Sequence, residues 1–215
     1  MSDLPDPLTL IGLLVALALI PFLAVMVTSF IKLVVVLSLI RNALGIQQIP
    51  PNIVLNGIAL ILTVYIMAPV GFETWDILKS QNLNYTELDR LGGVFEEAQK
   101  PLKAFLIENA DENERNFFRD TTAALWPERY AQNVTNEHFL VVIPAFTVAE
   151  LTRAFEIGFM LYLPFIAIDL IVSNILLAMG MVMVSPMTIS LPFKLFLFVM
   201  VDGWTRLIHG LVLSY

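Results

Sequence analysis

The chain has 215 residues, of which 58% are hydrophobic and only 14% charged, and its formal net charge is −7. Soluble globular domains usually carry about a quarter charged residues, so this composition excludes a free soluble enzyme, a disordered chain and a fibrous repeat. The sequence contains no cysteine, which excludes disulfides, thiolate catalysis and cysteine-based metal sites. The absence of a basic patch excludes the nucleic-acid-binding class.

The first apolar segment runs over residues 8–40 and is interrupted by Pro21 and Lys32. Its length exceeds the roughly 20 residues that one helix needs to span a bilayer. We therefore expect one long kinked helix, or two shorter helices that meet near Pro21, where the proline ring removes a backbone hydrogen bond.

A polar turn follows, because a glycine, two glutamines and two prolines cluster within residues 41–52. The candidate site residues in this turn are Arg41, Gln47, Gln48, Pro50 and Pro51. A second apolar segment, residues 53–70, ends at Pro69 and Gly71. Together these segments predict an N-terminal apolar hairpin over residues 1–70.

Residues 71–138 form an acidic insert, whose 13 acidic and 7 basic side chains contribute −6 to the net charge. Apolar residues at helical spacing predict one buried helix face. These residues are Val94, Ala98, Leu102, Phe105 and Leu106. Pro101 interrupts the pattern, which allows two short helices in place of one. The pairs Thr86–Asp89 and Asp111–Glu114 fit capping boxes that begin helices.

Residues 139–215 are again mostly apolar and predict a C-terminal hairpin. An apolar run over residues 157–184 is followed by a turn, which we expect over residues 185–192. A final apolar segment extends from residue 193 to residue 215.

Charged residues within or beside these apolar segments are costly in lipid, which favours their burial against protein. The candidates for ion pairs within the chain or between subunits are Glu150, Arg153, Glu156, Asp169 and Lys194. We predict one long-range pair, Glu150 with Lys194, because both lie close to a segment boundary. Lys32 and Arg206 are candidates to lie at helix ends, with their charged heads among lipid headgroups.

A turn from Gly180 to Pro186 lies within the C-terminal segment. Four methionines surround it: Met179, Met181, Met183 and Met187. In an arbitrary membrane protein such methionines most often fill gaps in the core. Because methionine is unbranched and deformable, a ring of these side chains can instead seal around an extended chain. An apolar constriction also holds back water and ions by dewetting. Such a ring requires several copies around an axis.

Catalytic motifs are missing from the sequence. It contains no zinc-protease His-Glu-x-x-His, no Gly-x-Ser-x-Gly, no phosphate-binding loop and no dinucleotide-binding loop. Its two histidines, His138 and His209, lie far apart and do not indicate a metal site. We therefore expect no enzymatic activity, no metal and no cofactor.

Specific motifs occur along nearly the whole chain and are weakest in residues 72–137. They are Phe30-Ile31-Lys32, residues 41–52, Pro144-Ala145-Phe146, Glu150-Leu151, residues 154–159, Leu163-Pro164-Phe165, Asp169-Leu170, residues 185–194 and Asp202-Gly203-Trp204. This set closely resembles the SctR family, the R subunit of the type III secretion export apparatus, which is homologous to the flagellar protein FliP. The absence of a long leader favours the virulence injectisome branch over the flagellar branch.

The resemblance implies an all-α fold of long kinked helical hairpins with a helical periplasmic insert, assembled as a cone-shaped oligomer. It implies a homopentamer joined by one T subunit and four S subunits in the bacterial inner membrane, with the gate body on the periplasmic side. The implied function is a pore for unfolded polypeptides, closed by a gasket at Met181, Val182 and Met183. Many relatives carry methionine at position 182, so Val182 shortens the ring, and Met187 is a further candidate.

The positive-inside bias places the Arg41 turn toward the cytoplasm, with the acidic insert on the opposite, periplasmic side. Both turns would then face the cytoplasm or the pore interior. A small-solute transporter or ion-channel subunit is the alternative function, because Asp169 and Asn174 lie in an apolar segment and the two hairpins form a weak repeat. A membrane-embedded enzyme is disfavoured by the missing motifs.

Overall fold

A computed structural model of the chain describes residues 6–46, 48–80 and 88–215, and within these ranges every regular element is a helix. The expected all-α class is therefore confirmed. The helices are α1 (Pro7–Met26), α2 (Phe30–Ala43), α3 (Asn52–Ser80), α4 (Leu88–Ala98), α5 (Lys100–Asn109), α6 (Glu112–Leu125), α7 (Glu128–Ala131), α8 (Phe139–Ala178), α9 (Pro186–Met200) and α10 (Gly203–Val212).

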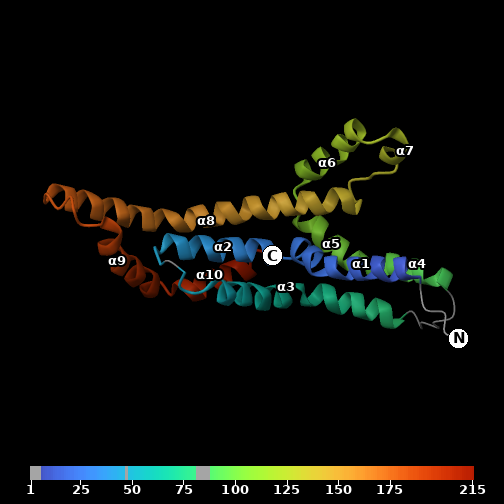
Figure 1. Ribbon diagram of the computed structural model, residues 1–215, viewed down its shortest axis with the longest axis horizontal. Coiled ribbons are helices and arrows are strands. Elements are labelled where there is room, and N and C mark those ends of the chain that lie inside the picture. Colours follow the sequence, from blue (N-terminus) through green and yellow to red (C-terminus); the bar gives the residue numbers. More distant parts are fainter. Residues whose placement is uncertain (1–5, 47, 81–87) are drawn as a thin grey trace.

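The long helix α8 extends along most of the long axis of the molecule, and α1, α3 and α4 reach beyond its N-terminal end (Figure 1). Helix α8 has 40 residues, which corresponds to about 60 Å at the rise of an α-helix. Helix α2 lies along α8 and separates it from α3 for part of this length. The turn between α8 and α9 lies at one end of the long axis, whereas α4 to α7 lie in the opposite half of the molecule.

The main hydrophobic core is built around α2. Its residues Leu33, Val36 and Leu37 are completely buried and pack with apolar side chains of α3, α8, α9 and α10. A second cluster, centred on Leu106 and Phe146, joins α5 and α6 to the N-terminal part of α8. Because burial of apolar surface is the main stabilising term in folding, α2 is the element on which the other long helices depend.

The first apolar segment does break into two helices, but the expected position near Pro21 is wrong. Pro21 lies inside α1, and the break covers residues 27–29. At the break the Thr28 hydroxyl donates to the carbonyl of Ala24 at 2.8 Å. Thr63 and Thr147 make the same bond inside continuous helices, so this bond alone does not cause the break. The break instead coincides with a tertiary contact, because Ser29 is completely buried and its carbonyl lies 3.3 Å from the Tyr215 hydroxyl.

Two other expected boundaries are also wrong. Helix α3 continues through Pro69 to Ser80 and does not end near residue 70. The second turn covers residues 179–185, whereas residues 186–192 begin α9. Pro186 is the first residue of α9, a position where its missing N–H has no partner to lose. In both cases a proline that indicated a turn is accommodated within a helix.

The insert matches the sequence prediction more closely. Separate helices α4 and α5 replace one longer helix, and Pro101 lies in the first turn of α5. The carboxylate of Asp111 accepts a hydrogen bond from the backbone N–H of Asn113 at 2.8 Å and caps α6. Both expectations are confirmed, while Thr86 of the other capping box lies outside the described residues.

Three helices in the described residues, Leu8–Met26, Asn52–Ser80 and Phe139–Ala178, are long and apolar enough to cross a membrane. The span in α1 is the extreme case, because none of its window is buried in the chain. A helix that is apolar on all sides needs lipid or other protein around it. These helices fit a membrane protein.

Helices α9 and α10 are bent relative to each other by 60°. At the bend Asp202 has a positive φ of 53°, and Gly203 lies directly against the ring of Phe198. A Cβ atom at Gly203 would come within 2.4 Å of that ring. The Phe198 ring also meets Trp204 edge to face at 5.4 Å between centroids. The close approach of Gly203 therefore fixes how α10 packs beneath α9.

We expect Gly203→Ala to lower the unfolding free energy of the purified chain by about 1–3 kcal/mol, because the new methyl group would displace the Phe198 ring. The matched control is Gly210→Ala in the same helix, where no atom lies within 4 Å of the added Cβ. The control should raise stability by about 0.5–1 kcal/mol through helix propensity. Denaturant titrations in detergent would measure both, and equal effects of the two variants would contradict the role of Gly203.

Candidate functional site

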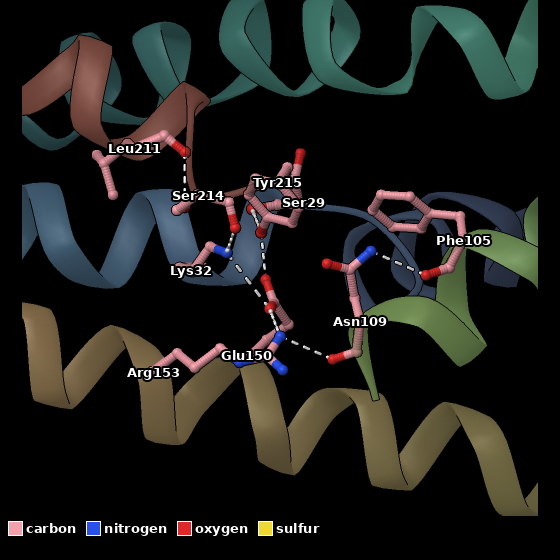
Figure 2. Close-up of polar contacts among 9 residues, drawn as sticks. All are labelled: Ser29, Lys32, Phe105, Asn109, Glu150, Arg153, Leu211, Ser214 and Tyr215. Carbon is pink, nitrogen blue, oxygen red and sulfur yellow. Dashed lines mark hydrogen bonds and ion pairs between the residues drawn. The ribbon is translucent and has the colours of Figure 1, made fainter. Parts of the chain in front are cut away.

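A buried charge cluster joins the N-terminal third of α8 to α2 and to the C-terminal segment (Figure 2). The carboxylate of Glu150 is completely buried. It lies 3.4 Å from the ammonium of Lys32 and 3.1 Å from a guanidinium nitrogen of Arg153. It also accepts a hydrogen bond from the hydroxyl of Tyr215. We call Lys32, Glu150, Arg153 and Tyr215 the Glu150 cluster.

Each member of the Glu150 cluster reaches a further element. Lys32 donates to the carbonyl of Ser214 at 3.4 Å, and its Nζ lies 3.3 Å from the centre of the Tyr215 ring. Arg153 donates to the carbonyl of Asn109, which ends α5, at 2.8 Å. The cluster therefore ties α2, α5, α8 and the C-terminal segment together, as Figure 2 shows.

Tyr215 is the neutral member of the cluster. Its ring stacks on Phe105 of α5 with centroids 6.0 Å apart. Burial raises the pKa of the Tyr215 phenol far above its usual range, and the neighbouring Glu150 carboxylate raises it further. The phenol consequently stays protonated and can donate a hydrogen bond to the Glu150 carboxylate.

The predicted pair of Glu150 with Lys194 is wrong within the chain. The two residues lie in separate clusters, since Glu150 pairs with Lys32 and Arg153 and Lys194 pairs with Asp169. The reason is that α2 lies along α8 and brings Lys32 opposite Glu150. The headgroup position considered for Lys32 is wrong for the same reason, because Lys32 is 0% exposed.

A second polar cluster lies where α2, α8 and α9 meet. Lys194 of α9 donates to the carboxylate of Asp169 at 2.6 Å and to the backbone carbonyl of Ala43 at 3.1 Å. The hydroxyl of Ser190 donates to the other oxygen of Asp169 at 2.6 Å. We call Ala43, Asp169, Ser190 and Lys194 the Lys194 clamp.

The predicted turn residues close the connection between α2 and α3. Arg41 donates to the carbonyl of Pro50 at 3.2 Å and to the side chain of Asn52 at 2.5 Å. The carbonyl of Pro51 accepts the first backbone hydrogen bonds of α3, including one from Val54 at 2.9 Å. Gln48 takes a positive φ of 61°. Gln47 lies outside the described residues.

The methionine turn, residues 179–187, begins with a specific helix end. Gly180 has a positive φ of 74°, and its N–H donates to the carbonyl of Leu177 at 3.0 Å. The N–H of Met181 donates to the carbonyl of Leu176 at 2.9 Å. This pair of bonds is the Schellman motif, which needs a left-handed residue after the helix. Gly180 therefore stops α8 and directs the chain into the turn.

The side chains of the methionine turn point away from the core of the chain. Met181 is 41% exposed, Val182 76%, Met183 98% and Met187 60%. They do not fill gaps in the core of this chain, which was the ordinary role considered for such methionines. An exposed apolar tip at the far end of the molecule calls for neighbouring protein or a shared central space.

The remaining predicted charges lie nearer the surface. The Arg153 side chain is 40% exposed and that of Asp169 is 34% exposed. Glu156 is exposed and lines an apolar groove of α8 together with Phe155 and Phe159. The proposed contacts of these charges between subunits remain predictions. The described residues contain no group of three or more His, Asp or Glu side chains that could hold a metal ion.

Sequence reasoning missed the parts of both clusters that are not charged. Tyr215 and Ser190 are ordinary polar residues, and no pattern in the sequence marks them. The carbonyls of Ala43 and Asn109 are backbone groups at helix ends, which a sequence cannot assign to partners. A helix-end rule does predict that such carbonyls need donors from elsewhere.

Comparison with known proteins gives consistent matches. The sequence profile of the FliP family matches residues 13–211. The chain is 56% identical over 215 residues to the Yop proteins translocation protein R of Yersinia pestis, covering 100% of this chain and 99% of that protein. It is 49% identical over 219 residues to the virulence protein YscR of Salmonella typhimurium, covering 99% of each. It is 47% identical over 210 residues to the hypersensitivity response secretion protein HrcR of Ralstonia nicotianae, covering 96% of each.

We expect Glu150→Ala to lower the unfolding free energy of the chain by about 3–5 kcal/mol, because it leaves Lys32 buried without its carboxylate. Glu156→Ala, six positions along the same helix, is the matched control and should change stability by less than about 0.5 kcal/mol. Thermal unfolding of the two purified variants in detergent would compare them. Equal stability of Glu150→Ala and the parent chain would contradict the cluster's role.

Proposed function

The chain belongs to the FliP family, with its expected SctR-type membership confirmed, and we propose that it is a pore-forming core subunit of a bacterial type III secretion export gate. Relatives of nearly equal length carry the names of translocation and secretion proteins. In this proposal the assembled subunits conduct unfolded polypeptides and do no chemistry of their own. Energy for export comes from other components of the apparatus.

The large apolar surface of the single chain supports an assembly. Helix α1 has no buried residue in its most apolar 18-residue window, and α8 has 11% of the corresponding window buried. Exposed side chains on α8 include Phe155, Phe159 and Leu163. Surfaces of this kind mark contacts with other protein or with lipid. We propose that copies of this chain cover them as a homopentamer in a cone-shaped gate, together with S and T subunits.

The observation that carries the proposal is the exposure of the methionine turn. Met183 is 98% exposed and Val182 76%, and the turn that carries them lies at one end of the long axis (Figure 1). Repeated around an axis, several such turns would meet in the centre. Flexible methionine side chains could then seal the pore at rest and yield to a passing polypeptide.

The location follows from the same proposal. The apolar helices belong to an inner-membrane complex whose body extends to the periplasmic side. The turn that follows α2 and the methionine turn lie away from helices α4 to α7 of the acidic insert (Figure 1). This separation supports an orientation with both turns toward the cytoplasm or pore interior and residues 71–138 toward the periplasm.

The alternative of a small-solute transporter or ion-channel subunit rested on Asp169 and Asn174. The carboxylate of Asp169 already binds Lys194 and Ser190, at 2.6 Å to each. A carboxylate with two close partners is a poor candidate for a free ion or substrate ligand. This observation favours the export proposal.

We expect the double variant Met181→Ala/Met183→Ala to make the closed assembly conduct ions, because the shorter side chains leave an open gap. Single-channel recordings of the purified complex in planar bilayers would measure the leak. Met160→Ala/Met200→Ala is the matched control, since both methionines are exposed on the helices, 70% and 66%, away from the turn. An unchanged conductance in the first variant would remove the gasket assignment.

Cross-linking from the turn would separate export from solute transport. A photoreactive residue placed at Val182 should trap a secreted polypeptide when the assembly is stalled during export. A saturable flux of a small solute, with no trapped polypeptide, would instead support the transporter alternative. The same photoreactive residue at the exposed position Leu60 of α3, away from the turn, serves as the control.

A further inference from the structure

We propose that Lys194 is a positioning residue, which fixes the methionine turn relative to the turn that joins α2 and α3. This inference rests on the proposed function, in which the methionine turn closes the pore. It assigns that task to the Lys194 clamp, whose members come from α2, α8 and α9.

The carbonyl of Ala43 is one of the last in α2 and has no partner within the helix. The chain leaves α2 through Gly45, whose φ is 74°, so the carbonyl stays open to a donor from another element. Lys194 supplies that donor at 3.1 Å. Its positive charge also matches the negative end of the α2 dipole. Since α2 is the centre of the core, this bond anchors α9 to the most rigid part of the fold.

The ammonium of Lys194, which lies on α9, also binds α8, the other helix of the α8–α9 hairpin. Asp169 of α8 receives Lys194 on one carboxylate oxygen and Ser190 on the other, each at 2.6 Å. Lys194 is only 4% exposed, whereas the Asp169 side chain is 34% exposed, so water reaches the carboxylate but not the ammonium of this pair. One side chain therefore joins both arms of the α8–α9 hairpin to the end of α2.

Beyond the clamp, packing within the chain does little to hold the hairpin. Between Asp169 and Ser190 only Leu176 is buried. A partly open apolar groove of about 370 Å³ separates the two arms there, lined by residues that include Ile171, Ile175 and Ile189. Side chains that face this groove lack contacts with the opposite arm. Within residues 169–194, all of which the structure describes, the clamp supplies the only side-chain hydrogen bonds between the two arms.

A distance measurement across the clamp tests this inference. The chain has no cysteine, so cysteines introduced at Ile53 and Met183, which are 81% and 98% exposed, can carry two spin labels without competition. Labelled chains would be diluted with unlabelled ones, so that each complete assembly carries one labelled copy. We expect Lys194→Met to broaden the distance distribution about twofold, and Lys194→Arg to keep it narrow.

Two further variants separate the clamp from simpler explanations. The exchange Asp169→Lys/Lys194→Asp keeps an ion pair between α8 and α9 but removes the ammonium from Ala43, so the distribution should stay broad. Lys32→Met removes the other buried lysine and should lower thermal stability without broadening this distance. A narrow distribution in the exchange variant, or equal broadening in Lys32→Met, would overturn the proposal.

Recordings of ion leak on the same preparations test the role of the Lys194 clamp separately from the proposed gasket function of the methionine turn. Assemblies of the Met181→Ala/Met183→Ala variant should leak ions. Spin labels at Ile53 and Val182 in this variant should still give a narrow distance distribution. If that variant does not leak while Lys194→Met broadens the distance, the gasket fails and the clamp stands. If it leaks while Lys194→Met leaves the distance narrow, the gasket stands and the clamp fails.

Discussion

The structure depends on burying one carboxylate, that of Glu150, in the middle of an otherwise apolar interface. An ionised carboxylate without partners is too costly to bury, so Lys32, Arg153 and Tyr215 must all reach the same point. Of these partners, Lys32 comes from α2, so its pairing with Glu150 favours the rotation and register of α2 against α8 that bring the two side chains together. The Glu150 cluster also holds the C-terminal segment against α5 and α2. The core around α2 supplies the driving force, and the Glu150 cluster selects one arrangement.

The Lys194 clamp is a second case of a buried charge that must be paired, and it lies nearer the methionine turn. Both clusters consist of a lysine that binds a carboxylate on α8 and a backbone carbonyl elsewhere: Ser214 for Lys32, and Ala43 for Lys194. Together they attach α8 to its neighbours at two points along its length. The exposed methionine turn lies beyond the second point and the insert helices near the first. The chain thus combines two buried polar clusters along α8 with an exposed methionine turn at its end.

Several elements could be read from the sequence because their causes are local. The start of α6 follows from Asp111, and the division of α4 from α5 follows from Pro101. Prolines were less informative elsewhere. Pro21 and Pro69 lie inside helices, because losing one N–H does not stop a helix whose other residues favour it. The break at residues 27–29 lacked a sequence signal of comparable strength.

The sequence by itself determined the class of protein, the acidic insert, the methionine turn and the need for its buried charges to be paired. Composition, periodicity and helix-end residues are local features, so they can be recognised in the sequence without the tertiary structure. Only the tertiary structure decided which charges pair. Lys32 and Glu150 are 118 positions apart, and Tyr215 lies 65 positions from Glu150. Ion pairing follows distance in space, and any acid here matches any base by charge alone. The packing of α2 along α8 decides which of them meet.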